Sequence, residues 1–88
     1  MKTVNITLPN TNWLNIEEIS DVVFENGKPY AVTFRGGLDN QVCISDTTPT
    51  NSMLGHPLAA NENFHYTPES GLSLFVKTGF AGTTVVLS

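Results

Sequence analysis

The sequence predicts an all-β fold: a single small antiparallel β-sandwich of Greek-key or jelly-roll type, or a partly open barrel, with roughly six to eight short strands. Short runs of the chain alternate between apolar and polar residues, and turn-forming residues separate these runs at spacings of about ten residues. No long segment repeats its apolar residues at the helical period of about 3.6 residues. The 88 residues are expected to form one domain, 1–88, and a chain this short buries only about two-thirds of its unfolded surface.

The first predicted strand spans residues 3–8, where three apolar side chains alternate with three polar ones. Pro9 and Asn10 end it, because both residue types favour turns. After Trp13, the stretch 17–20 has a composition that can begin a helical turn.

The pair Asn26-Gly27 predicts a hairpin between strands at 22–25 and 29–35, because both residues tolerate the positive φ that a two-residue hairpin turn requires. One face of the second strand carries three large apolar residues that we expect to be buried: Tyr30, Val32 and Phe34.

Residues 36–40 are rich in turn formers and predict the next reversal, which leads into a strand at 41–45. Within that strand, Val42 and Ile44 share one parity and are expected to point inward.

The C-terminal part of the chain predicts another hairpin. Residues 72–77 alternate like a strand, the segment Gly79-Phe80-Ala81-Gly82 reverses the chain, and 83–87 form the final strand.

The stretch between these regions is long and mostly without periodicity. A structureless loop of this length is improbable in a compact domain, so we expect a strand at 63–67, with Phe64 and Tyr66 on one side and His65 on the other. The irregular connection then spans 46–62. Its residues 57–59 are expected to bring the chain back over the edge of the sandwich.

The composition argues against several classes of partner. Four Lys and Arg stand against eight Asp and Glu, for a formal charge of -4, which opposes binding to nucleic acid. No apolar run is long enough for membrane insertion or for a signal peptide. The single Cys43 cannot form an internal disulfide, and this indicates a reducing compartment.

No catalytic residues, metal site or cofactor are predicted, and we do not expect an enzyme. His56 and His65 are the only imidazoles, so a zinc site would need carboxylates such as Asp46, Glu62 or Glu69, and no ligand spacing is recognisable. A serine triad also lacks its sequence context.

The predicted interaction site lies on the second face of the strands, where parity places four residues that are unusual for a solvated surface: Ala31, Cys43, Phe75 and Val86. This apolar face predicts either contact with another subunit or a covering loop. Residues 46–62 are expected either to form that cover or to be an arm that reaches a neighbouring subunit. The alternative function is a carbohydrate- or receptor-binding module, because sugar rings stack on exposed aromatic side chains, here Trp13, Tyr30 and Tyr66.

The order of segments along the chain resembles that of the small β-sandwich structural proteins of tailed bacteriophages. Trp13 precedes "ENGKPYAVTF", then come "QVCISDTTPT" and "GHPLAANENFHY", and "GLSLFVKTGFAGTTVVLS" closes the chain. The resemblance implies a non-enzymatic virion component, such as a head decoration protein or a neck or tail accessory subunit. Such a protein is made in the host bacterial cytoplasm, forms a homo-oligomer, with a trimer as one possibility, and binds other virion proteins.

Overall fold

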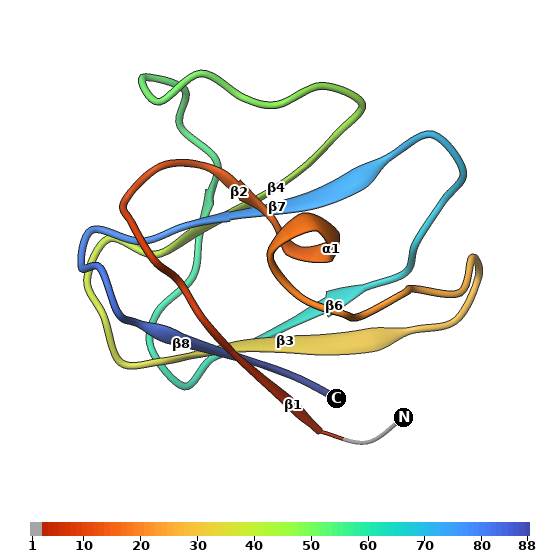
Figure 1. Cartoon of the computed structure of the whole chain (residues 1–88), viewed down its shortest axis with the longest axis horizontal. Coiled ribbons are helices and arrows are strands. Elements are labelled where there is room, and N and C mark those ends of the chain that lie inside the picture. The colour runs from red at the N-terminus through yellow and green to blue at the C-terminus, as the bar shows by residue number, and fades with distance from the viewer. Residues whose placement is uncertain (1–2) are drawn as a thin grey trace.

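The computed structural model describes residues 3–88, which form eight β-strands and one helical turn arranged as two stacked sheets (Figure 1). The elements are, in chain order, β1 (Val4–Thr7), β2 (Leu14–Asn15), α1 (Ile16–Ile19), β3 (Tyr30–Arg35), β4 (Gln41–Ser45), β5 (His56–Pro57), β6 (Asn63–Tyr66), β7 (Ser73–Lys77) and β8 (Thr84–Leu87). The predicted all-β sandwich is therefore confirmed. The short α1 overlaps the stretch 17–20, whose composition can begin a helical turn, and the Asn15 side chain caps it by accepting from the Glu17 amide at 3.0 Å.

Each sheet has four antiparallel strands, in the order β1-β8-β3-β6 for the first and β2-β7-β4-β5 for the second. Apart from β4 and β5, consecutive strands belong to different sheets. The His56 ring of β5 lies 6.0 Å from the Phe64 ring of β6, so these two edge strands are on the same side of the molecule. Matching positions in the two layers are thus held by β1 and β2, β8 and β7, β3 and β4, and β6 and β5, and this is the strand order of a jelly roll.

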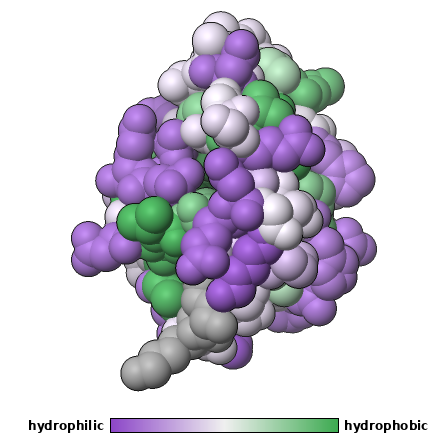
Figure 2. All heavy atoms as spheres, turned by 90° about the vertical axis from the view of Figure 1, so that its right-hand side faces the viewer, coloured by the Kyte–Doolittle hydropathy of each residue, from purple (hydrophilic) through white to green (hydrophobic). Residues whose placement is uncertain are grey.

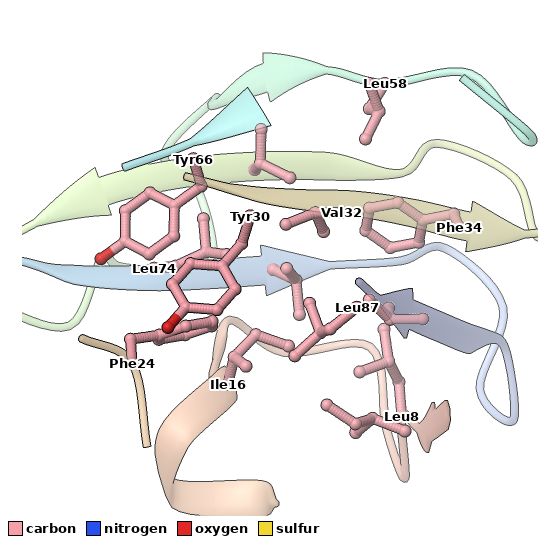
Figure 3. Close-up of a cluster of buried hydrophobic side chains, with 14 residues drawn as sticks. Leu8, Ile16, Phe24, Tyr30, Val32, Phe34, Leu58, Tyr66, Leu74 and Leu87 are labelled. Carbon is pink, nitrogen blue, oxygen red and sulfur yellow. The ribbon is translucent and has the colours of Figure 1, made fainter. Parts of the chain in front are cut away.

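The core fills the space between the sheets (Figure 3). Tyr30, Val32 and Phe34 are buried on the inner face of β3, as their alternation predicts. From the second sheet, Leu74 and Val76 of β7 point into the same core. On the side where β1 and β2 form the sheet edges, Ile16 of α1 is fully buried, so the helical turn helps to close the sandwich there.

The predicted strand at 22–25 is wrong, although the turn after it is present. Gly27 has φ +80° and the Lys28 amide donates to the Glu25 carbonyl at 3.2 Å. Residues 22–25 cannot pair with β3, because β6 and β8 already occupy both of its edges. Instead, the Phe24 ring packs edge-on against Tyr30 and Tyr66, with ring centroids 4.8 and 5.3 Å apart, and closes one end of the core.

The predicted C-terminal hairpin is also wrong. Residues 79–82 reverse the chain, but β7 pairs with β2 and β4 in the second sheet, whereas β8 pairs with β1 and β3 in the first. The reversal at 36–40 likewise connects the two layers. A turn signal fixes where the chain changes direction, and it does not fix whether the next strand pairs with the previous one or stacks across the core.

Two expectations for the middle of the chain have different outcomes. Ile44 is 44% exposed rather than buried, because the neighbouring β5 pairs only with Gln41 and Val42 and leaves the end of β4 at an open edge. The strand predicted at 63–67 is confirmed as β6, and before it the buried Leu58 brings the chain from the second sheet back to the first.

Candidate functional site

The four residues of the predicted interface do not lie on one face. Ala31 and Val86 belong to β3 and β8 and are half-buried on the outer face of the first sheet. Cys43 and Phe75 are register partners on β4 and β7, on the outer face of the second sheet. The sandwich therefore separates the predicted interface into two pairs on opposite sides of the molecule.

Residues 46–55, here called the cover segment, fold over the outer face of the second sheet (Figure 1, green). Trp13 lies beneath it and is only 5% exposed. The Trp13 indole Nε1–H donates to the Met53 carbonyl at 3.3 Å, and the Trp13 amide donates to Oδ1 of Asn51 at 3.4 Å. A Cβ atom added to Gly55 would approach the Trp13 ring to 2.5 Å, so the chain passes against the indole where only glycine fits.

A lysine ties the cover segment to the strand beneath it. Nζ of Lys77 donates to the Asn51 carbonyl at 2.6 Å and lies 6.0 Å from the centre of the Trp13 ring. Asn51 in turn donates through its side-chain amide to Oδ1 of Asn12 at 2.9 Å. Of the two roles expected for the long connection, the structure has it cover the face within one chain.

The three aromatic residues of the carbohydrate-binding alternative are all buried. Tyr30 and Tyr66 lie in the core around Phe24 (Figure 3), and Trp13 lies on the other face of the second sheet under the cover segment. The carbohydrate-binding alternative requires Trp13 to be exposed beside another aromatic residue, and Trp13 is instead buried under the cover segment. These residues stabilise the fold and present no ring face on which a sugar could stack.

Tyr66 carries a buried hydroxyl that has no hydrogen-bond partner among residues 3–88. By contrast, the nearby Tyr30 hydroxyl accepts from the Glu25 amide at 3.0 Å. Burial raises the pKa of Tyr66, and the negative charges of Glu17 and Glu69 raise it further. Burial and the two nearby negative charges thus favour the neutral form of this phenol.

The two histidines are not brought together. His56 is exposed and contacts the ring of Phe64, whereas His65 points to the opposite side of β6. Among residues 3–88, no group of three His, Cys, Asp or Glu side chains is placed to hold a metal ion.

The most ordered polar cluster lies where two connections between the sheets meet, at residues 36–40 and 78–83. The buried Thr78 hydroxyl donates to Oδ1 of Asn40 at 2.9 Å and accepts from the Phe80 amide at 3.2 Å. Asn40 donates to the Gly36 carbonyl at 2.9 Å, and the Gly79 amide donates to the Leu38 carbonyl at 2.7 Å. This network of buried, mutually satisfied groups fixes the two loops against each other.

Three large exposed apolar side chains lie on or beside these loops, and we call them the end patch: Leu38 and Phe80 on the two loops, and Leu54 on the cover segment. Leu38, Leu54 and Phe80 are 70%, 83% and 64% exposed. A hollow of about 540 Å³ adjoins Leu54 and is lined also by Asp39, Asn40 and Gln41, which places Leu54 beside the loop that carries Leu38. The sequence analysis missed this patch. Its signal was the presence of leucine and phenylalanine inside glycine-flanked turns, where polar residues are usual.

No helix within residues 3–88 is long and apolar enough to cross a membrane. Comparison of the chain with protein-family models, with curated proteins and with solved structures found no match.

Proposed function

We propose that the protein is a non-enzymatic structural subunit that associates with further copies of itself through the end patch. The observation that carries the proposal is the exposure of Leu38 and Phe80 on loops that a buried polar network holds rigid, with the exposed Leu54 of the cover segment beside the first of these loops. Exposed apolar groups that gather at one site are typical of protein–protein contacts. Because the loops are already ordered, association would cost little conformational entropy.

The surroundings of the end patch also suit a protein partner. Asp39 is the charged residue of the adjoining hollow, and its other walls are formed by amide, glycine and proline groups. An apolar centre with a polar and weakly charged rim is the usual composition of an interface between proteins. The jelly-roll order is found among viral capsid and lectin domains, which is an analogy at the level of the fold only.

The test is the native mass of the purified protein, measured by light scattering across a dilution series. We expect a multimer that Phe80→Lys dissociates, because the substitution places a charge in the centre of the contact. Val23→Lys is the matched control, since Val23 is also exposed but lies outside the end patch. A wild-type monomer at every concentration, or a multimer that Phe80→Lys leaves intact, would contradict self-association through this patch.

The particle to which such a subunit belongs is a narrower proposal. We propose a tailed-bacteriophage virion, with the subunit in a head decoration or neck or tail accessory position, and this proposal rests on the order of sequence segments alone. Mass spectrometry of purified virions tests it directly. Recovery of peptides of this chain in stoichiometric amounts supports it, and their presence only in the soluble fraction of the lysate argues against it.

A further inference from the structure

The β1 strand leaves one edge of the first sheet unpaired in the part of the chain that the structure describes. Ile6 is the register partner of Val85, and the Leu8 amide donates to the Thr83 carbonyl at 2.9 Å. Since alternate residues of an antiparallel strand bond to the same neighbour, Val4 and Ile6 direct their main-chain groups to β8. The N–H and C=O groups of Asn5 and Thr7 therefore point away from the sheet.

A groove of about 470 Å³ with both apolar and polar lining residues runs along this unpaired edge, between β1 and residues 19–23. Val4, Ile19 and Val22 line it, are partly buried and pack against the core, and Val23, on its wall, is 80% exposed. Figure 2 shows hydrophobic side chains surrounded by hydrophilic ones at the left of that view, the side on which α1 and β1 lie. Main-chain hydrogen-bonding groups thus stand directly beside a groove that offers apolar contacts on both sides.

This edge also lacks the features by which proteins normally protect edge strands. Such edges are kept very short, or carry charged residues or proline. Two other edge strands of the sandwich, β2 and β5, have two residues each, and β5 contains Pro57. The other two edge strands, β1 and β6, have four residues each, and none of the four residues of β1 is charged or proline.

We propose that the β1 edge binds an extended segment of a partner protein by strand addition, with alternate side chains of that segment seated in the groove. The segment would form hydrogen bonds with Asn5 and Thr7, while apolar residues at every second position would enter the space between β1 and residues 19–23. A strand of four residues spans about 13 Å, which suits a short peptide rather than a whole domain face.

The charges around the groove define the partner further. Asp21 lines it, and Glu17 and Glu18 are exposed on the adjacent α1. These carboxylates favour a segment with basic flanking residues. They also disfavour a second copy of this chain at the same edge, because two-fold pairing of β1 with β1 would bring two identical acidic groups toward each other.

The proposal is tested with a blocked synthetic peptide, Lys-Val-Thr-Val-Thr-Val-Lys, titrated into the isotopically labelled protein and followed by NMR. We expect saturable shifts of the Asn5 and Thr7 amides, slower hydrogen exchange at both, and shifts of the amides of 19–23. Two further peptides carry N-methyl groups at the odd or at the even positions. One of these two should lose at least about tenfold in affinity and the other should retain most of it, because only alternate amides face β1.

Matched variants separate this site from the end patch. Val23→Lys should weaken peptide binding several-fold, whereas Phe80→Lys should leave it unchanged. Absence of saturable binding at about 1 mM peptide, a concentration that detects even weak complexes, would overturn the proposal. Equal effects of the two N-methylated peptides would also overturn it. A wild-type dimer that Val23→Lys dissociates and Phe80→Lys does not would instead identify a second copy as the occupant of the edge.

Discussion

The two outer faces of the sandwich carry apolar residues at matching strand positions, yet only one of them holds large side chains under a cover. On the second sheet, Trp13 and Phe75 are buried, and the cover segment 46–55 lies against the indole. On the first sheet, Ala31 and Val86 stay half-buried beside polar neighbours such as Thr33. The comparison teaches that an apolar residue with outward parity is not by itself a sign of a subunit interface. The size of the side chain, and the presence of a segment long enough to cover it, decide its environment.

The largest expected effect comes from removing the anchor of the covered face. Trp13→Ala should lower the free energy of unfolding by about 3 kcal/mol, because it deletes a buried aromatic ring and leaves the cover segment without its main contact. Urea denaturation followed by circular dichroism measures the change. A loss below about 1 kcal/mol would mean that the cover segment contributes little to stability.

A smaller loss is expected from Gly55→Ala. The added Cβ would stand 2.5 Å from the Trp13 ring and 2.6 Å from the Val42 carbonyl, so the cover segment must move away from the sheet. The expected cost is about 2 kcal/mol, and thiol labelling of Cys43 should become faster because Cys43 lies on the same face. Ser52→Ala, an exposed change in the same segment, should cost less than about 0.5 kcal/mol. Equal stability and labelling rates in the two variants would contradict close contact between the cover segment and the indole.

An effect smaller than that of Gly55→Ala is expected in the core between the two sheets, where Tyr66 is buried. Tyr66→Phe should raise stability by about 1 kcal/mol at neutral pH, because it removes a buried hydroxyl that has no partner among residues 3–88. Burial, assisted by the charges of Glu17 and Glu69, raises the pKa of Tyr66 in the folded chain. The stability that the folded chain gains by keeping the Tyr66 phenol protonated is fully present below the unfolded pKa of about 10. It is lost as the pH rises through the raised pKa of Tyr66 in the folded chain.

The wild-type protein should therefore lose stability between about pH 9 and about pH 11, and Tyr66→Phe should lose less. Urea unfolding at both pH values makes the comparison. The same loss in both proteins would show that Tyr66 is not the group that titrates.

The smallest effect concerns the uncovered face. Val86→Thr on the first sheet should change stability by less than about 0.5 kcal/mol, since a hydroxyl there reaches water. Val85→Thr, one residue earlier on the same strand, should cost roughly 2 kcal/mol, because Val85 is fully buried and the hydroxyl would enter the core. Similar costs for the two variants would contradict the assigned faces of β8.

The sequence predicted the buried face of individual strands but not the arrangement of the strands in the two sheets. Alternation correctly predicted which side chains of β3 and β6 are buried, because the period of two is a local property of the strand. Alternation could not predict which strands pair with one another. The turns at 36–40 and 79–82 were located correctly, but both cross between the sheets, and only contacts across the whole domain determine that outcome.

The functional residues were harder to predict, for a related reason. Burial of Trp13 depends on Asn51 and Met53, which lie about forty positions later in the chain, and no local pattern indicates that contact. The end patch likewise draws on three separate segments: two connections that meet through the Asn40 and Thr78 side chains, and the cover segment that carries Leu54. The absence of charged residues from β1, by contrast, is visible in the sequence. It bears on strand addition only because β1 lies at the edge of a sheet, which the sequence does not show.

The cover segment closes the outer face of the second sheet within a single chain. The end patch and the β1 edge are then the two surfaces that we propose for partners. Trp13 is the only tryptophan, so its fluorescence reports on this face directly. We predict blue-shifted emission and weak quenching by acrylamide at every protein concentration, including dilutions at which light scattering finds the monomer. Emission that shifts to the red on dilution, with quenching that rises toward that of free tryptophan, would show that another subunit provides the cover and would contradict the claim.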